Sequence, residues 1–442
     1  MKKSFWLIFF LALFLRLFRV GAPVLKEDEF ITVAGAAYVY HCQLDQSRCR
    51  YQPSSFKDRL LALMTANETT PNLLAEVYLW DYIKDRASDI HHSRAWPQLY
   101  AAAAVYHWLG INEFSSRLVS VVAGSLLVIA GYWLSRSLCS SVKLSLLYSG
   151  LLAVSFPLID FSRNARFYSL YALIFLLTVA LAYKAKWWLA LPLLVLAYFL
   201  QMLTLILPVA ILGWSIWERR YRVTGFLLGG LALTAGLSYY LGIDFFGRQF
   251  LTLPWPPQWR YFNWWWILST IILLVKKQKF LLSIISVYYL VLIFFTRPTP
   301  GAAYVIALWP LSLWPLINWR RWLTGLVVVM VLLDFTSKIN YLYFGRDDRA
   351  QIPAAYGVIL NNFEPGDKIY AIQLKDYYLQ DLPENTLVID LQQNPDPKFD
   401  GSGFVVWEQE KTGFLKPETI EYIKSNFKYL GSGGVEIYSF GK

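Results

Sequence analysis

Long apolar blocks, separated by short polar turns, run along the chain from residue 4 to residue 340. A helix needs about 20 predominantly apolar residues, within a range of about 17–25, to cross the hydrocarbon core of a bilayer. The blocks therefore predict a polytopic α-helical membrane protein with about eleven spans. The predicted spans cover residues 4–20, 115–135, 142–159, 167–183, 187–200, 203–217, 223–241, 262–275, 280–296, 302–318 and 322–340.

Basic residues in the turns orient these spans. With the blocks crossing in succession, every basic cluster falls on one side, and the positive-inside bias places that side and the N-terminus in the cytoplasm. The short blocks 187–200 and 203–217 are accepted as spans because basic clusters flank both ends of the stretch, which requires an even number of crossings. The clusters are Lys2/Lys3, Arg136/Lys143, Lys184/Lys186, Arg219/Arg220/Arg222, Lys276/Lys277/Lys279 and Arg320/Arg321, with Glu218 as the one acid among them.

Residues 21–114 then form a long first outer loop. Within it, residues 31–40 and 73–82 are short and amphipathic, which is typical of helices that lie in the membrane interface. Residues 96–110 are apolar, but about 15 helical residues rise only about 22 Å, against a hydrocarbon core of about 30 Å. Counting this stretch as a span would also move all later basic clusters to the opposite face, so we predict a third interfacial helix.

The composition changes after about residue 341, where long apolar blocks give way to mixed sequence. Residues 349–363 and 417–427 have helical periodicity, and four short β-branched or aromatic runs, at 367–373, 386–390, 403–407 and 435–439, predict strands. We therefore predict two domains: a transmembrane domain over 1–341 and a small soluble extracytoplasmic α/β domain over 342–442.

Composition and charge agree with a membrane protein. The 442 residues are 56% hydrophobic and 16% charged, against about 25% charged residues in soluble domains. The formal charge of +11 does not indicate a nucleic-acid partner, because the basic residues sit in short clusters between apolar blocks, as membrane orientation requires.

Two of the three cysteines, Cys42 and Cys49, lie in the first outer loop. In an oxidising compartment they are expected to form a disulfide; two free thiols are the alternative. Cys139 stands alone beside a basic cluster, and no zinc-type spacing is present.

A short acidic stretch, Glu27-Asp28-Glu29, follows directly after the first span. A carboxylate beside an apolar wall can act as a base on a substrate that arrives dissolved in lipid. The alternative is a solvated acidic loop, since charge runs beside spans are common.

Further polar groups stand at the predicted outer mouths of other spans. Arg163 and Arg166 are three residues apart, would face the same way on a helical turn, and have forked guanidinium groups that suit a phosphate. Snorkelling to lipid headgroups is the alternative for both. Asp160 is a second acidic candidate or a partner of Arg163. His92, with a surface role as its alternative, and Arg297 complete the candidate phosphate site.

Several motifs, taken in order, resemble the GT-C glycosyltransferases of family 39 type, which include protein O-mannosyltransferases and lipid A aminoarabinose transferases. An acidic Asp28-Glu29 follows the first span, and a long loop leads to Trp96-Pro-Gln-Leu-Tyr100. Next come Leu109-Gly-Ile-Asn-Glu-Phe-Ser-Ser-Arg-Leu-Val-Ser120, Gly124, Ser162-Arg-Asn-Ala-Arg-Phe-Tyr-Ser-Leu170 and the soluble C-terminal domain.

This resemblance implies a polyprenyl-phosphate-sugar donor and transfer on the outer face. It aligns Asp28 with the first-loop catalytic acid and places Asp160 near the second acidic position. Four positions depart from the pattern: Gln98 stands in an expected Pro-Pro pair, Trp96 replaces His or Lys, Ala303 replaces the Arg of a late Arg-Tyr with Arg297 upstream, and Gln201 replaces a His.

We therefore predict an inverting glycosyltransferase of the plasma membrane in which Asp28 takes the proton of an acceptor hydroxyl. Glu29 or Asp160 would orient Asp28, or Asp28 and Asp160 would hold Mg²⁺ or Mn²⁺, which favour oxygen ligands. Arg163, Arg166, Arg297 and His92 would hold the donor phosphate. The acceptor is a lipid, a glycan or a protein.

Three alternatives stay open. The first is a ligase or polymerase that moves a longer glycan from a lipid diphosphate. The second is a lipid or solute transporter, although transporters favour internal repeats and charges at the membrane midplane, and this chain has no internal symmetry. The third is a non-catalytic scaffold, for which Asp28→Asn would behave like wild type in cells.

Overall fold

The computed structural model describes residues 2–21, 76–78, 95–139, 141–240, 264–295, 305–343 and 351–372, and parts of 29–40 and 379–441. Contacts divide the chain into two compact units. One comprises Met1–Val20 and Ile90–Tyr343, and the other Gly21–Asp89 and Phe344–Lys442.

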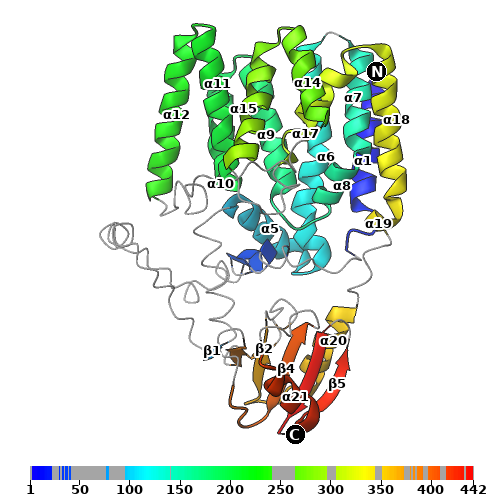
Figure 1. The fold of residues 1–442 in the computed structure, drawn as a ribbon, viewed down its shortest axis with the longest axis vertical. Helices are drawn as coiled ribbons and strands as arrows, with labels where there is room; N and C mark the ends of the chain where they lie inside the picture. Colours follow the sequence, from blue (N-terminus) through cyan, green and yellow to red (C-terminus); the bar gives the residue numbers. More distant parts are fainter. Residues whose placement is uncertain are drawn as a thin grey trace. The chain divides into compact units, whose positions relative to one another are not determined.

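The first unit is a helical bundle whose elements follow the predicted apolar blocks (Figure 1). The structure confirms helices in the predicted apolar blocks, and most helix boundaries fall within a few residues of the predicted ones. The helices are α1 (Lys2–Leu17), α5 (Trp96–Leu109), α6 (Glu113–Leu138), α7 (Val142–Val154), α8 (Phe156–Ser162), α9 (Tyr168–Tyr183), α10 (Trp187–Leu200), the 3-10 helix η2 (Met202–Leu205), α11 (Ile206–Trp217), α12 (Tyr221–Tyr240), α14 (Trp264–Val275), α15 (Lys279–Phe295), α17 (Trp309–Ile317), α18 (Arg321–Ser337) and α19 (Ile339–Tyr343).

Individual helices in the described part of the chain are mostly shorter than a full span. By length and composition α6 is long and apolar enough to cross a membrane, and α7 with α8 passes the same test as a pair bent by 54°. Shorter apolar helices include α9, α10 and α11. The count of about eleven spans therefore stays a prediction.

The predicted span over 142–159 consists of two helices in the structure, α7 and α8, with Ser155 extended between them. Proline has no N–H, so Pro157 cannot donate to the carbonyl of Ala153 four residues earlier. The buried guanidinium of Arg16 donates to this carbonyl at 3.2 Å and to that of Leu152 at 3.4 Å. An arginine of α1 thus satisfies the backbone acceptors that the break in α7 exposes.

Close helix packing in this region depends on two glycines of α6. A methyl group at Gly131 would collide with the side chain of Leu152 on α7. One at Gly124 would lie 2.5 Å from Cβ of Ser162 and 3.1 Å from Nε of Arg16. Gly124, part of the motif that suggested the family, therefore lets α8 and the Arg16 side chain reach α6.

The second unit contains a six-stranded sheet, against which helices α20 (Gln351–Asn362) and α21 (Pro417–Asn426) pack. The strand order is β1-β3-β2-β4-β6-β5; β2 pairs in parallel with β3 and β4, and the other pairs are antiparallel. The strands are β1 (Glu76–Tyr78), β2 (Lys368–Ala371), β3 (Leu387–Asp390), β4 (Gly403–Glu408), β5 (Lys428–Ser432) and β6 (Val435–Phe440).

Alternation along β2 gives this sheet two apolar faces. Ile369 and Ala371 pack in one cluster with Tyr356 and Ile359 of α20, whereas Tyr370 packs in the other cluster, with Ile423 of α21. This is the expected pattern for a sheet covered on both faces. The predicted strands at β2, β3, β4 and β6 are confirmed, and β5 was missed.

The first strand comes from the long first loop. Glu76–Tyr78 forms β1, antiparallel to β3, with Val77 opposite Val388. The predicted helix over 73–82 is therefore wrong at these residues. The described positions between 32 and 40 are helical, as is the segment 96–109, in agreement with the sequence.

Candidate functional site

The short turn between α8 and α9 carries the two arginines that the sequence singled out. Its residues Arg163, Asn164 and Ala165 are buried, whereas Arg166 is partly exposed. Hydrogen bonds from Arg163 place this turn at the C-terminal end of α1 and beside the end of α19. The turn thus lies at the end of the helical unit opposite the N-terminus, where Figure 1 shows α5 and α19.

Arg163 donates hydrogen bonds to backbone carbonyls of two other segments and so clamps them together. Its Nη1 lies 2.5 Å from the carbonyl oxygen of Phe18 and 3.3 Å from that of Arg16, while Nη2 lies 3.2 Å from the carbonyl of Leu342. The guanidinium also lies 4.7 Å from the ring centroid of Tyr343. The last carbonyls of a helix have no partner within it and attract cations. Arg163 therefore caps α1 and joins it to α19.

These contacts bear on the predicted phosphate site. The side chain of Arg163 is 1% exposed, and its fork of N–H groups points to carbonyl oxygens of two other segments. A phosphate role for Arg163 stays a prediction; the contacts favour a role in holding segments together.

Two further residues, outside the predicted site, hold the same end of α1. Buried Arg117 of α6 donates to the carbonyl of Val20 at 2.8 Å, and the hydroxyl of Tyr343 donates to that of Leu15 at 2.7 Å. Burial raises the pKa of Tyr343, partly opposed by the nearby charges of Arg163 and Arg16, so the phenol keeps its proton at neutral pH. The signal for Arg117 was an arginine inside an apolar block.

Arg166 differs from Arg163 in exposure and surroundings. Its guanidinium lies 5.5 Å from the ring centroids of both Phe167 and Tyr168, and Nη2 lies 3.4 Å from the Tyr168 hydroxyl. Partial exposure leaves this cation accessible, and the two rings limit its movement. Of the two arginines, Arg166 is the one placed to meet an anion.

A polar chain fixes the backbone of Arg166. The Ser120 hydroxyl donates to the Arg166 carbonyl at 2.8 Å, and Nε2 of Gln98 lies 3.4 Å from Ser120 Oγ. Gln98 is fully buried, and its Oε1 has no hydrogen-bond partner among the residues that the structure describes. The Ser120 hydroxyl proton is used for the Arg166 carbonyl, so Ser120 Oγ accepts a hydrogen bond from Gln98. Gln98, which stands where the family pattern has proline, therefore has a structural role.

The first turn of α5 also contacts the end of α10. The Ala95 N–H donates to the Phe199 carbonyl at 2.8 Å, and the Trp96 and Phe199 rings lie 5.6 Å apart. Ala95 has a φ of 64°, a strained value for a residue with a Cβ. Gln201, at the position where relatives often have His, is the C-cap of α10 and is 4% exposed.

Two of the three predicted carboxylates, Asp160 and Glu29, are among the described residues. Asp160 is partly exposed on α8, one turn before Arg163, and Glu29 is helical and 1% exposed. The described residues contain no group of three or more His, Cys, Asp or Glu side chains able to hold a metal. Metal binding by Asp28 and Asp160 stays a prediction. Asp28, His92, Arg297, Cys42 and Cys49 lie outside the described residues.

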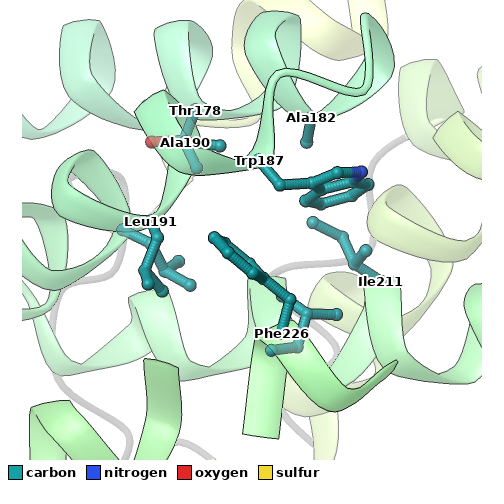
Figure 2. Close-up of a pocket in the computed structure, with 9 residues that line it drawn as sticks. Thr178, Ala182, Trp187, Ala190, Leu191, Ile211 and Phe226 are labelled. Atoms are coloured by element: carbon teal, nitrogen blue, oxygen red, sulfur yellow. The ribbon is translucent and has the colours of Figure 1, made fainter. Parts of the chain in front are cut away.

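A separate hollow between α9, α10, α11 and α12 has no reactive group. Figure 2 shows Trp187 and Phe226 reaching across it, with Leu191 and Ile211 on either side. Its empty space, which includes open solvent, is about 230 Å³, and the hydroxyl of Thr178 on its wall donates to the carbonyl of Ile174. Such a lining suits hydrocarbon rather than a sugar or a phosphate.

The helical unit and the small α/β unit follow a fold already seen in solved structures of one membrane protein, over almost the full chain. The apo structure of ArnT from Cupriavidus metallidurans aligns with a TM-score of 0.59 at 11% identity, covering 98% of this chain and 96% of ArnT. The ArnT structure bound to undecaprenyl phosphate aligns with a TM-score of 0.57 at 11% identity, covering 99% and 97%.

These likenesses confirm the predicted resemblance at the level of the fold, and with it a polytopic helical membrane protein. No protein-family model and no curated protein matches the sequence.

Proposed function

We propose that the protein is a membrane glycosyltransferase that moves a sugar from a polyprenyl-phosphate donor to an acceptor hydroxyl. The observation that carries this proposal is the fold likeness over almost the full length of both chains to ArnT, one structure of which holds undecaprenyl phosphate. A partly exposed, aromatic-flanked arginine at one end of the bundle is consistent with it.

The chemistry assigns each predicted residue a role. Asp28 accepts the proton of the acceptor hydroxyl as that oxygen attacks the anomeric carbon. The bond from this carbon to the phosphate oxygen breaks on the opposite side, so the configuration inverts. The polyprenyl phosphate leaves with the electron pair, and Arg166 stabilises its charge, with Arg297 and His92 as further phosphate ligands. Glu29 or Asp160 orients Asp28.

Arg163 has a positioning role in this proposal. It binds carbonyls at the end of α1, from which the chain continues toward Asp28, and it immediately precedes the turn that bears Arg166. Its clamp therefore holds the exit of the first helix against the proposed phosphate turn. A shift of about 1 Å between reacting groups lowers rates by about a hundredfold, which is why such a clamp matters.

The proposed setting follows the distribution of charge. Transfer takes place at the end of the bundle away from the basic turns, on the extracytoplasmic face of the plasma membrane. The acceptor is a lipid, a glycan or a protein.

The identity of the bound lipid tests the proposal. The full chain, purified from its native membrane, is extracted with organic solvent, and the lipids are identified by mass spectrometry. A copurified polyprenyl monophosphate, free or bearing a sugar, supports the proposal. A polyprenyl diphosphate bearing a longer glycan would instead identify a ligase or polymerase. If the protein in proteoliposomes moved the sugar-lipid across the membrane without hydrolysing it or transferring its sugar, it would be a transporter.

A further inference from the structure

The basic end of the helical unit contains a cavity that the proposed transfer reaction does not use. It lies between the ends of α6, α9 and α11 and the turn that joins α14 to α15, and it encloses about 720 Å³, part of it open to solvent. Figure 1 shows this turn and the one between α11 and α12 at the same end as the N-terminus. The residues that matter for its chemistry are Tyr183, Trp214, Glu218, Lys277, Lys279 and Phe280.

Two lysines and one carboxylate give the cavity a net positive lining. Nζ of Lys279 lies 2.8 Å from Oε1 of Glu218 and 5.0 Å from the Trp217 ring centroid. Among the described residues, Lys277 makes no side-chain hydrogen bond or ion pair. Neighbouring Lys276 donates to the carbonyl of Asn318 and is not part of the lining. One cation is thus shared with a carboxylate and the other is uncommitted.

Aromatic side chains place the cavity at the level of lipid headgroups. The exposed Trp188, Trp217, Tyr221 and Trp322 all lie in or beside the basic turns, at 62–70% exposure. Trp and Tyr gather at membrane–water interfaces. Basic pockets between helices at this depth bind the headgroups of anionic lipids.

We propose that this cavity binds the phosphate of an anionic phospholipid. Lys277 and Lys279 contact the phosphate oxygens, while Tyr183, Trp214 and Phe280 form an apolar wall for the glycerol and the first acyl carbons. Glu218 competes with the phosphate for Lys279 and so keeps binding reversible. The site lies at the end of the bundle opposite Arg166 and does not depend on the proposed transferase activity.

Native mass spectrometry of the full chain tests this proposal with phosphatidylglycerol as the probe in mixed micelles. A basic residue near an anionic surface contributes about 1 kcal/mol, so Lys277→Gln should weaken binding about fivefold. Arg321→Gln is the matched control, because Arg321 is an exposed cation of the same end that does not line the cavity. Equal weakening by both variants would show only a general charge effect and overturn the site.

A second variant acts in the opposite direction. Glu218→Gln removes the competing carboxylate and frees Lys279, so phosphatidylglycerol should bind about two- to fivefold more tightly. A misfolded variant would not gain affinity. Phosphatidylcholine should not replace the anionic lipid, and millimolar inorganic phosphate should not displace it. Unchanged binding by Glu218→Gln, equal binding of phosphatidylcholine, or displacement by phosphate would each overturn the proposal.

Discussion

Nη1 of Arg163 lies 2.5 Å from the carbonyl oxygen of Phe18, so the turn that follows α8 is fastened to the end of the first helix. This arrangement separates the two arginines of the predicted phosphate site. Arg163 binds backbone carbonyls, whereas Arg166, three residues later, presents its guanidinium between two aromatic rings. The two side chains should therefore respond differently to substitution.

Replacement of Arg163 should lower stability and turnover without weakening donor binding. Lysine in Arg163→Lys keeps the charge but has no planar fork, so at least one buried carbonyl loses its donor, at a cost of about 1–3 kcal/mol. We expect a lower unfolding midpoint, a lower kcat and a donor KM within about twofold of wild type. Unfolding in detergent and donor titration in liposomes measure these quantities. A raised donor KM with unchanged stability would return Arg163 to the phosphate site.

Replacement of Arg166 should have the reverse effect. Arg166→Ala removes a partly exposed cation whose side chain lies beside two rings, so stability should change little. A charge-assisted hydrogen bond contributes about 1.5–3 kcal/mol, which predicts donor affinity lower by about tenfold to a hundredfold. Lys338→Ala is the control, since Lys338 is an exposed cation of the same end that pairs with Asp334 at 2.7 Å. Unchanged donor affinity in Arg166→Ala would remove Arg166 from the site.

The sequence predicted the helices well because helix formation in a membrane depends on local composition. Each apolar block must satisfy its own backbone hydrogen bonds, so block and helix coincide. The break after α7 is the exception. Its signal was Pro157, but the donor that compensates for the missing N–H, the Arg16 side chain, lies on another helix.

Contacts between distant segments account for what was missed. The strand Glu76–Tyr78 is too short to outweigh a helical pattern, and its partner β3 belongs to the C-terminal segment. In the same way, the residue types of Arg163 and Arg166 suggested a shared phosphate. No local pattern shows that the carbonyls of Phe18 and Leu342 lie within reach of one of them.

The Arg16–Pro157 relationship predicts an interaction between mutations. Arg16→Met leaves the carbonyls of Ala153 and Leu152 without this donor, at a cost of about 1–3 kcal/mol each. Pro157→Ala restores an N–H that can bond to Ala153, so Arg16→Met should cost about 0.5–3 kcal/mol less in that background. Unfolding free energies of the four proteins in detergent measure the coupling.

The control for this cycle is Gly150→Ala on the same helix. A methyl group at Gly150 has nothing within 4 Å, so its effect should add to that of Arg16→Met. Additivity in the Pro157 cycle as well would show that Arg16 does not compensate for the missing proline N–H.

The proposed base makes the most direct prediction. Asp28→Asn keeps the shape of the side chain but cannot take a proton, so turnover in donor-supplied liposomes should fall by about 10²–10⁴-fold. Insertion, the unfolding midpoint and the amount of bound polyprenyl lipid should stay at the wild-type level, because the phosphate site is intact. Asp334→Asn, which changes a partly exposed aspartate on α18, should retain full turnover. Wild-type turnover by Asp28→Asn would refute the assignment, and loss of the bound lipid with the activity would make Asp28 a binding residue instead.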